Sequence, residues 1–179
     1  MSAKHNLLSF TTAFVVLAVM ALILINNPKL IDQLLGLSSP PHLSDKELIL
    51  NFHQHRMEFE RLQKMIGDDE GLSRLDAENV QFKTVESSPV GETRISEYRA
   101  LLRKIGVRGG ISVSTDRKTI EITSTHRGMV THNSQKGYLY IGGPVMGELF
   151  SDLDRFSQTE TGSGLRHIEG NWYIYFEGY

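Results

Sequence analysis

The sequence predicts an α+β fold in which an N-terminal transmembrane helix precedes a small domain of two or three helices packed on an antiparallel sheet. Three observations lead to this prediction. Residues 7–25 contain no charge, glycine or proline; apolar residues recur at helical spacing between Leu48 and Ile66; and apolar and polar residues alternate after Ile111. Helical periodicity followed by consecutive segments of strand periodicity indicates an α+β domain.

The apolar stretch Leu7–Ile25 has the length of a membrane span. Nineteen residues rising about 1.5 Å each come close to the hydrocarbon core of a bilayer, which is roughly 30 Å thick. A cleaved signal peptide is the alternative, but such peptides have an apolar run of about 7–15 residues followed by small residues. Here Leu24, Ile25 and Asn26 stand where a peptidase needs small side chains. We therefore predict that residues 1–27 form a short tail and an uncleaved anchor.

The charges beside this anchor predict its orientation. Lys4 and His5 precede it without any acid, whereas Lys29 after it is offset by Asp32. Basic residues favour the cytoplasmic side, so we expect a single-pass protein of the inner (plasma) membrane whose C-terminal domain lies in the periplasm. The sequence contains no cysteine, which excludes disulfides, thiolate metal sites, cysteine nucleophiles and lipid attachment at cysteine.

Residues 28–43 are predicted to be a juxtamembrane spacer, because Ser38, Ser39, Pro40 and Pro41 break any helix. The remaining residues, 44–179, are the size of one ordinary domain with its own hydrophobic core.

The first helix of this domain is predicted from Ser44 to Ile66. Ser44 and Glu47 have the spacing of a capping box, and Gly67 ends the periodic stretch. Its apolar stripe has a spacing of 4-3-4-3-4 and consists of Leu48, Phe52, His55, Phe59, Leu62 and Ile66. This stripe suits packing on the domain's own sheet, while a short coiled coil with a second copy is the alternative.

The later elements follow from changes in period. Residues 68–90 are polar and are predicted to be irregular, and a second helix is predicted from Thr93 to Ile105. A short helix is predicted from Pro144 to Phe156. If residues 142–147 form the start of that helix, their backbone N–H groups could bind an anion. The predicted strands are Ile111–Val113, Ile120–Ile122, Met129–Ile141, and a closing hairpin of Leu165–Ile168 and Trp172–Phe176.

Four stretches of this domain resemble a group of small bacterial membrane-anchored proteins and lipoproteins. They are residues 98–102 (YRALL), 106–111 (GVRGGI), 136–138 (KGY) and 166–176 (RHIEGNWYIYF). The resemblance extends from about Leu48 to the end of the chain. It implies a bacterial envelope location, and because no activity is attached to that group, it implies no site residues.

The aromatic residues of the predicted strands are the candidate interaction surface. In a strand, alternate side chains point to opposite faces, so Trp172 lies on one face of the last strand and Tyr173 and Tyr175 on the other. An exposed set would form a platform of the kind found at interfaces and at sugar-stacking sites, whereas covered faces would make all of them core residues. The candidate residues are Tyr138, Tyr140, Trp172, Tyr173 and Tyr175.

No metal site, cofactor or catalytic residue is predicted. The seven histidines have no His-x-x-x-His spacing. Asp152 with Asp154, and the run Asp68-Asp69-Glu70, could act as paired carboxylates, but acids in polar segments are usually solvated or favour a helix start. Nineteen basic residues against 21 acidic ones do not suggest a nucleic-acid partner.

We therefore expect an anchored protein that presents a binding or structural domain on the extracytoplasmic side. Its partner would be another envelope protein or a second copy of the chain, besides the membrane itself. A membrane-tethered enzyme acting on an envelope substrate, or an immunity-type protein, is the alternative. Whether the chain is an enzyme stays open, although the absence of catalytic spacing favours a protein that is not.

Overall fold

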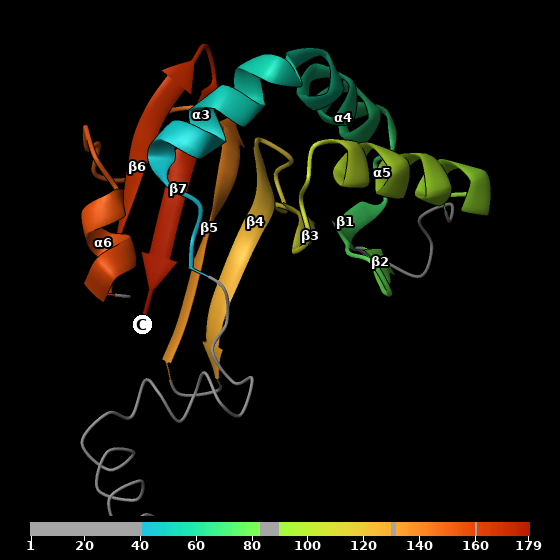
Figure 1. Cartoon of the computed structure of the whole chain (residues 1–179). Coiled ribbons are helices and arrows are strands. Elements are labelled where there is room, and N and C mark those ends of the chain that lie inside the picture. Colours follow the sequence, from blue (N-terminus) through green and yellow to red (C-terminus); the bar gives the residue numbers. More distant parts are fainter. Residues whose placement is uncertain (1–40, 83–89, 130–131, 160) are drawn as a thin grey trace, which may run out of the picture. The chain divides into compact units, whose positions relative to one another are not determined.

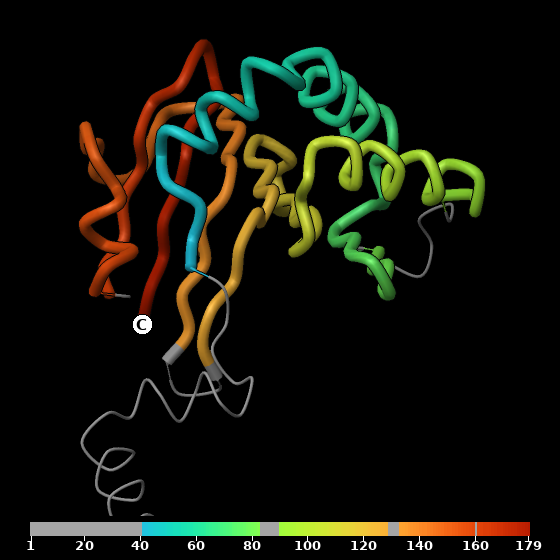
Figure 2. The backbone as a smooth tube through the Cα atoms, in the orientation of Figure 1, coloured from blue at the N-terminus to red at the C-terminus, as the bar shows by residue number. Residues whose placement is uncertain are grey.

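The computed structural model describes residues 41–82, 90–129, 132–159 and 161–179 (Figures 1 and 2). The predicted anchor Leu7–Ile25 and nearly all of the predicted spacer lie outside these ranges. Within them, no helix is both long and apolar enough to cross a membrane.

An antiparallel sheet of seven strands of unequal length makes up most of the described domain, with the strand order β2-β1-β3-β4-β5-β7-β6. The strands are β1 Leu72–Leu75, β2 Val80–Phe82, β3 Gly110–Val113, β4 Thr119–Met129, β5 His132–Ile141, β6 Gly162–Glu169 and β7 Trp172–Gly178. The helices in the described ranges are α3 Asp45–Gln54, α4 Arg56–Asp68, α5 Glu92–Lys104 and α6 Asp154–Thr159.

The predicted fold class, an α+β domain of two or three helices packed on an antiparallel sheet, is therefore wrong, because a seven-stranded antiparallel sheet with few helices makes up most of the described domain. Strands β1 and β2 lie in residues 68–90, which were predicted to be irregular. Each has only three or four residues, too few to show an alternating pattern, and pairing within the sheet is what makes them strands.

Two helical predictions also need correction. The helix predicted from Ser44 to Ile66 is interrupted at His55, whose φ of −117° and ψ of 25° separate α3 from α4. The helix predicted from Pro144 to Phe156 is replaced by six-residue α6, so Gly142–Gly147 does not open a helix and offers no helix N-terminus to an anion.

The N-terminus of α3 follows the predicted local chemistry. The backbone N–H of Ser44 donates to Glu47 Oε2 at 2.7 Å, and the backbone N–H of Glu47 donates to Ser44 Oγ at 3.3 Å. This reciprocal pair satisfies two amide groups that a helix start leaves without partners, and it confirms the capping box.

Helices α3, α4 and α5 cover one face of the sheet, and the main core lies between them and the strands (Figure 1). Phe59 of α4 packs its ring 4.6 Å from that of Tyr138 and 5.4 Å from that of Trp172. These centroid distances are typical of aromatic pairs that add to the free energy gained by burial. The largest buried side chains here include Phe52, Phe59, Tyr98, Tyr138 and Phe176.

Arg117, in the β3–β4 turn, joins the helical layer to the sheet. It has a φ of 60°, which is unusual for a residue with a side chain. Its guanidinium donates to the backbone carbonyls of Glu70 at 2.7 Å and Asp69 at 3.1 Å, and also to that of Ile66. A side chain remote in sequence thus satisfies carbonyl groups at the C-terminal end of α4.

On the opposite face of the sheet, none of the described helices covers β5, β7 and β6, and a second apolar cluster lies there. It consists of Ile141, Leu165, Tyr173 and Tyr175, with Leu139 packed against them. The segment 142–150 runs past this cluster to the edge of the sheet, where the Leu165 N–H donates to Glu148 O at 2.9 Å and the Phe150 N–H donates to Leu165 O at 2.8 Å. The edge strand β6 is thereby partly paired.

Candidate functional site

The five aromatic residues of the predicted interaction surface are divided between the two faces of the sheet. Tyr138, Tyr140 and Trp172 face the helices. Tyr138 is fully buried; its hydroxyl accepts from Asn51 Nδ2 at 2.8 Å and donates to Leu48 O at 3.2 Å. Burial raises the pKa of Tyr138 to about 12. These contacts place Tyr138 within the core.

Tyr173 and Tyr175 lie on the other face, where only 8% and 5% of their surfaces are exposed. The hydroxyl of Tyr175 donates to Glu121 Oε1 at 2.8 Å and lies 3.0 Å from Thr123 Oγ1. Burial, together with the charge of Glu121, raises the pKa of this hydroxyl well above its ordinary range. The structure does not bring the five residues together, and none of them offers an open aromatic platform; their part in binding stays a prediction.

A polar cluster that the sequence analysis did not predict joins α3, β5, α6 and β6. Lys136 of β5 is fully buried, and its Nζ lies 2.8 Å from Asp45 Oδ1 and 2.6 Å from Asp154 Oδ1. Asp45 Oδ2 accepts from Arg166 Nη1 and from the Leu153 N–H, both at 2.8 Å. We call Asp45, Lys136, Asp154 and Arg166 the buried ion cluster.

The buried ion cluster contains two carboxylates and two cations, so its formal charges cancel. Burial alone would raise the pKa of Asp45, but the Leu153 amide, Lys136 and Arg166 outweigh it, and the pKa lies below its ordinary value. Asp45 and Lys136 are almost wholly buried, while Asp154 and Arg166 are partly exposed. Removing Asp45 or Lys136 would leave its partner as an unpaired or poorly paired buried charge, which costs several kcal/mol. The cluster can therefore hold α3 and α6 in place on the sheet.

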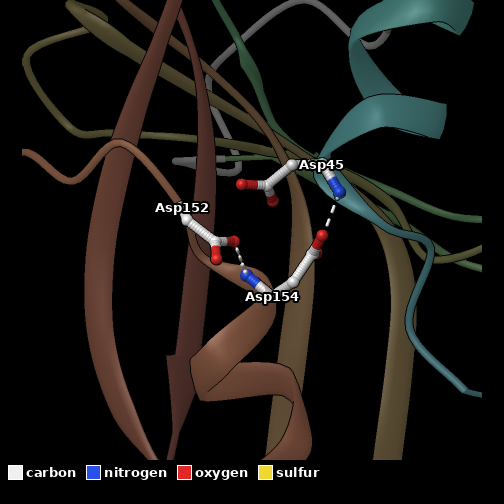
Figure 3. A group of neighbouring side chains, drawn as sticks. All are labelled: Asp45, Asp152 and Asp154. Atoms are coloured by element: carbon white, nitrogen blue, oxygen red, sulfur yellow. Dashed lines mark hydrogen bonds between the residues drawn. The ribbon is translucent and has the colours of Figure 1, made fainter.

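Asp45, Asp152 and Asp154 place carboxylate oxygens within 4.8 Å of one another (Figure 3). These residues do not fit a metal ion, because the Lys136 ammonium already lies between Asp45 and Asp154. Asp152 has a different partner: its Oδ1 accepts from the backbone N–H of Asp154 at 2.8 Å, at the start of α6. Asp152 therefore caps the start of α6, and Asp154 takes part in an ion pair with Lys136.

One signal in the sequence could have revealed this cluster. Lys136 is in phase with Ser134 and Tyr138 on β5, so its side chain must point to the same face as a core tyrosine. A lysine at a buried position requires an acidic partner. That partner, Asp45, lies 91 positions earlier in the chain, where no local pattern connects it with β5.

His42 provides a second polar contact between the start of the domain and the sheet. Its Nδ1 lies 2.7 Å from Thr125 Oγ1, and its Nε2 lies 2.8 Å from Ser134 Oγ. Burial lowers the pKa of His42 to about 4, and the positive charges of Arg127 and Lys136 act in the same direction. The ring is therefore neutral at physiological pH.

A pocket of about 230 Å³ lies between the helix-free face and the segment 142–150. Its lining includes Leu139, Leu165 and Tyr175, together with the carboxylates of Glu121, Glu148 and Glu177. Glu121 accepts from Tyr175, and Glu177 accepts from Gln135 Nε2 at 3.0 Å. No basic side chain in the described ranges forms an ion pair with any of the three carboxylates. We call this site the acidic pocket.

Exposed apolar side chains lie beside the acidic pocket on the same segment. Val145, Met146 and Leu149 are 39%, 87% and 56% exposed. Exposed apolar groups grouped next to a recess are more typical of a binding surface than of a surface that contacts only water. A search for similar proteins gives no further assignment: no family model, no curated protein and no solved structure matches the chain.

Proposed function

We propose that this chain is a membrane-anchored binding protein that presents the domain 41–179 on the extracytoplasmic side of the inner membrane. The apolar stretch Leu7–Ile25, the basic residues before it and the resemblance to bacterial envelope proteins support the location. The partner is another protein of the envelope.

The acidic pocket is the observation that carries this proposal. It combines an apolar floor with three carboxylates that have no cationic partner in the described part of the chain. A lysine or arginine side chain fits such a site, because its methylene groups can cover Leu139 and Leu165 while its charge reaches the glutamates. Met146 and Leu149 beside the pocket would then contact apolar residues that flank this basic residue.

The location can be tested by labelling, since the chain contains no native cysteine. In intact cells, a membrane-impermeant maleimide should label a Gln158→Cys variant, because residue 158 is exposed. It should label an Ala3→Cys variant only after lysis. Labelling of residue 3 but not of residue 158 in intact cells would contradict the proposed orientation.

The binding surface can be tested by photo-crosslinking with a photoreactive residue at position 146 or, as a matched control, at position 57. Met57 on α4 is 79% exposed but lies far from the acidic pocket in sequence and on the helical side of the domain. We expect a discrete adduct from position 146 only, lost when Glu148→Gln and Glu177→Gln are combined. The crosslinked partner peptide should contain a basic residue. Equal adducts from both positions would contradict the proposal.

A further inference from the structure

A second pocket, of about 250 Å³, lies where the C-terminal half of α5 meets the start of β3 and the β1–β2 turn. Its floor is apolar and is formed by the buried side chains of Leu102 and Val107, whereas the exposed Ala77 lies at its rim. Three arginines line it: Arg99 and Arg103 from α5, and Arg108 from the loop that follows. We call this site the arginine pocket.

Among the described residues, the three guanidinium groups lack a full set of counter-charges. Arg99 is held in position by its Nε, which donates to the backbone carbonyl of Asp76 at 3.2 Å. The side chains of Arg103 and Arg108 form no hydrogen bond or ion pair with any described residue. The nearby Asp76 carboxylate is already engaged, since its Oδ1 accepts from the amides of Glu78 and Asn79 at 2.9 and 2.7 Å.

This arrangement is unfavourable in the absence of an anion. Arg99 and Arg103 are four residues apart on one helix, and like charges at this spacing destabilise it. A third cation, Arg108, borders the same pocket. A bound oxyanion would relieve this repulsion and gain charge-assisted hydrogen bonds, which guanidinium groups form in bidentate geometry with carboxylates and phosphates.

The geometry points to the arginine pocket as a binding site for a carboxylate borne on a small apolar group. The apolar floor indicates a ligand with an apolar part, because covering Leu102 and Val107 gains free energy only when an apolar group makes the contact. The volume limits that group, since it lies below the 300–1,000 Å³ typical of sites for drug-sized ligands. A short-chain acid or the last residue of a polypeptide has this chemistry.

Isothermal titration calorimetry on the full chain, with two probes that differ only in charge, tests this inference. One probe is N-acetyl-alanyl-leucine with a free C-terminal carboxylate, and the other is the same compound as its C-terminal amide. We expect the acid to bind at least tenfold more tightly than the amide and to weaken as salt is added. Equal binding of the two probes would overturn the inference.

Variants then assign the binding to this pocket. Combining Arg103→Gln with Arg108→Gln should weaken binding of the acid about tenfold or more, because two charge-assisted contacts are lost. Both residues are exposed, so the variant should fold normally, and an unchanged midpoint of urea unfolding checks this. Lys46→Gln, an exposed position on α3 that does not line the pocket, should leave binding unchanged. Unchanged affinity in the double variant would overturn the assignment.

A second variant adds charge instead of removing it. Ala77 is exposed at the rim, and Ala77→Glu would place a carboxylate beside the arginines, where it should compete with the probe and weaken its binding severalfold.

Butyrate and inorganic phosphate as competitors identify the source of the ligand. Butyrate competing as well as the peptide acid indicates a free short-chain acid, and weaker competition indicates a polypeptide C-terminus. Phosphate competing more strongly than both would overturn the role of the apolar floor.

Discussion

Lys136 and Asp45 form an ion pair of 2.8 Å in which the lysine side chain is fully buried and the aspartate is 1% exposed. Asp45 opens α3, and Lys136 lies in the middle of β5, so this contact fixes the first described helix onto the sheet. Asp154 and Arg166 complete the cluster and extend it to α6 and β6. Four elements are therefore joined by one set of charges centred on the buried Asp45–Lys136 pair.

Removing the lysine should strongly destabilise the domain. We expect Lys136→Met to lower the free energy of unfolding by about 3–5 kcal/mol, because two carboxylates would lose the cation between them. Urea unfolding followed by the fluorescence of Trp172 measures this. Lys46→Met is the matched control: Lys46 is exposed on α3, next to Asp45, and its substitution should change stability by no more than about 0.5 kcal/mol. A similar small change for Lys136→Met would refute the structural role of the cluster.

His42 should make stability depend on pH between about 4 and 6.5. The unfolded chain takes up a proton at His42 below its ordinary pKa of 6.5, whereas the folded protein does so only near its lowered pKa of about 4. The contribution of the neutral ring to the free energy of unfolding is therefore fully present above pH 6.5 and decreases as the pH falls toward 4. Because the ring is only partly buried, we expect a loss of at most about 2 kcal/mol.

Urea unfolding at several pH values from 5 to 7 checks this dependence, since the carboxylates with lowered pKa contribute mainly at lower pH. His42→Asn should flatten the profile, and the control His53→Asn, which removes an exposed histidine, should not. If the free energy of unfolding of the His42 variant kept the same dependence on pH, another group would be its cause.

Two glycines should respond in opposite ways to the same substitution. A Cβ at Gly137 would collide with the backbone carbonyl of Ile122 and lie 2.8 Å from the Ser124 amide nitrogen, so Gly137→Ala must displace β4 from β5. We expect a loss of at least about 1–3 kcal/mol. At Gly67, near the end of α4, a Cβ would meet nothing within 4 Å. Gly67→Ala should therefore be neutral or raise stability by up to about 1 kcal/mol. Thermal unfolding of both variants tests the pair.

The parts of the fold that the sequence predicted correctly are those that depend on neighbouring residues. The capping box of Ser44 and Glu47, the start of α5 near Thr93 and the closing hairpin around Gly170 each arise within a few positions of the chain. The strands β1 and β2 were missed because their pairing partners, and not their own short sequences, determine them. The break at His55 was missed because the apolar stripe continues across it.

The candidate sites required contacts that no local pattern contains. The register of the sheet brings Glu121 of β4 and Glu177 of β7 to one face. Glu148, from the segment 142–150, completes the acidic pocket there. The predicted aromatic surface lies partly beneath it: Tyr175 is in its floor. Alternation correctly assigned Tyr173 and Tyr175 to one face, but only the path of residues 142–150 shows that this face is covered.

The contacts of Arg117 have a consequence for how the domain unfolds. Carbonyl groups at the end of α4 and just beyond it are satisfied by a turn that exists only once β3 and β4 have paired. The last turn of α4 and the β3–β4 hairpin should therefore open as one cooperative unit. In hydrogen–deuterium exchange, Arg117→Ala should accelerate exchange in both segments together, while α5 keeps its protection.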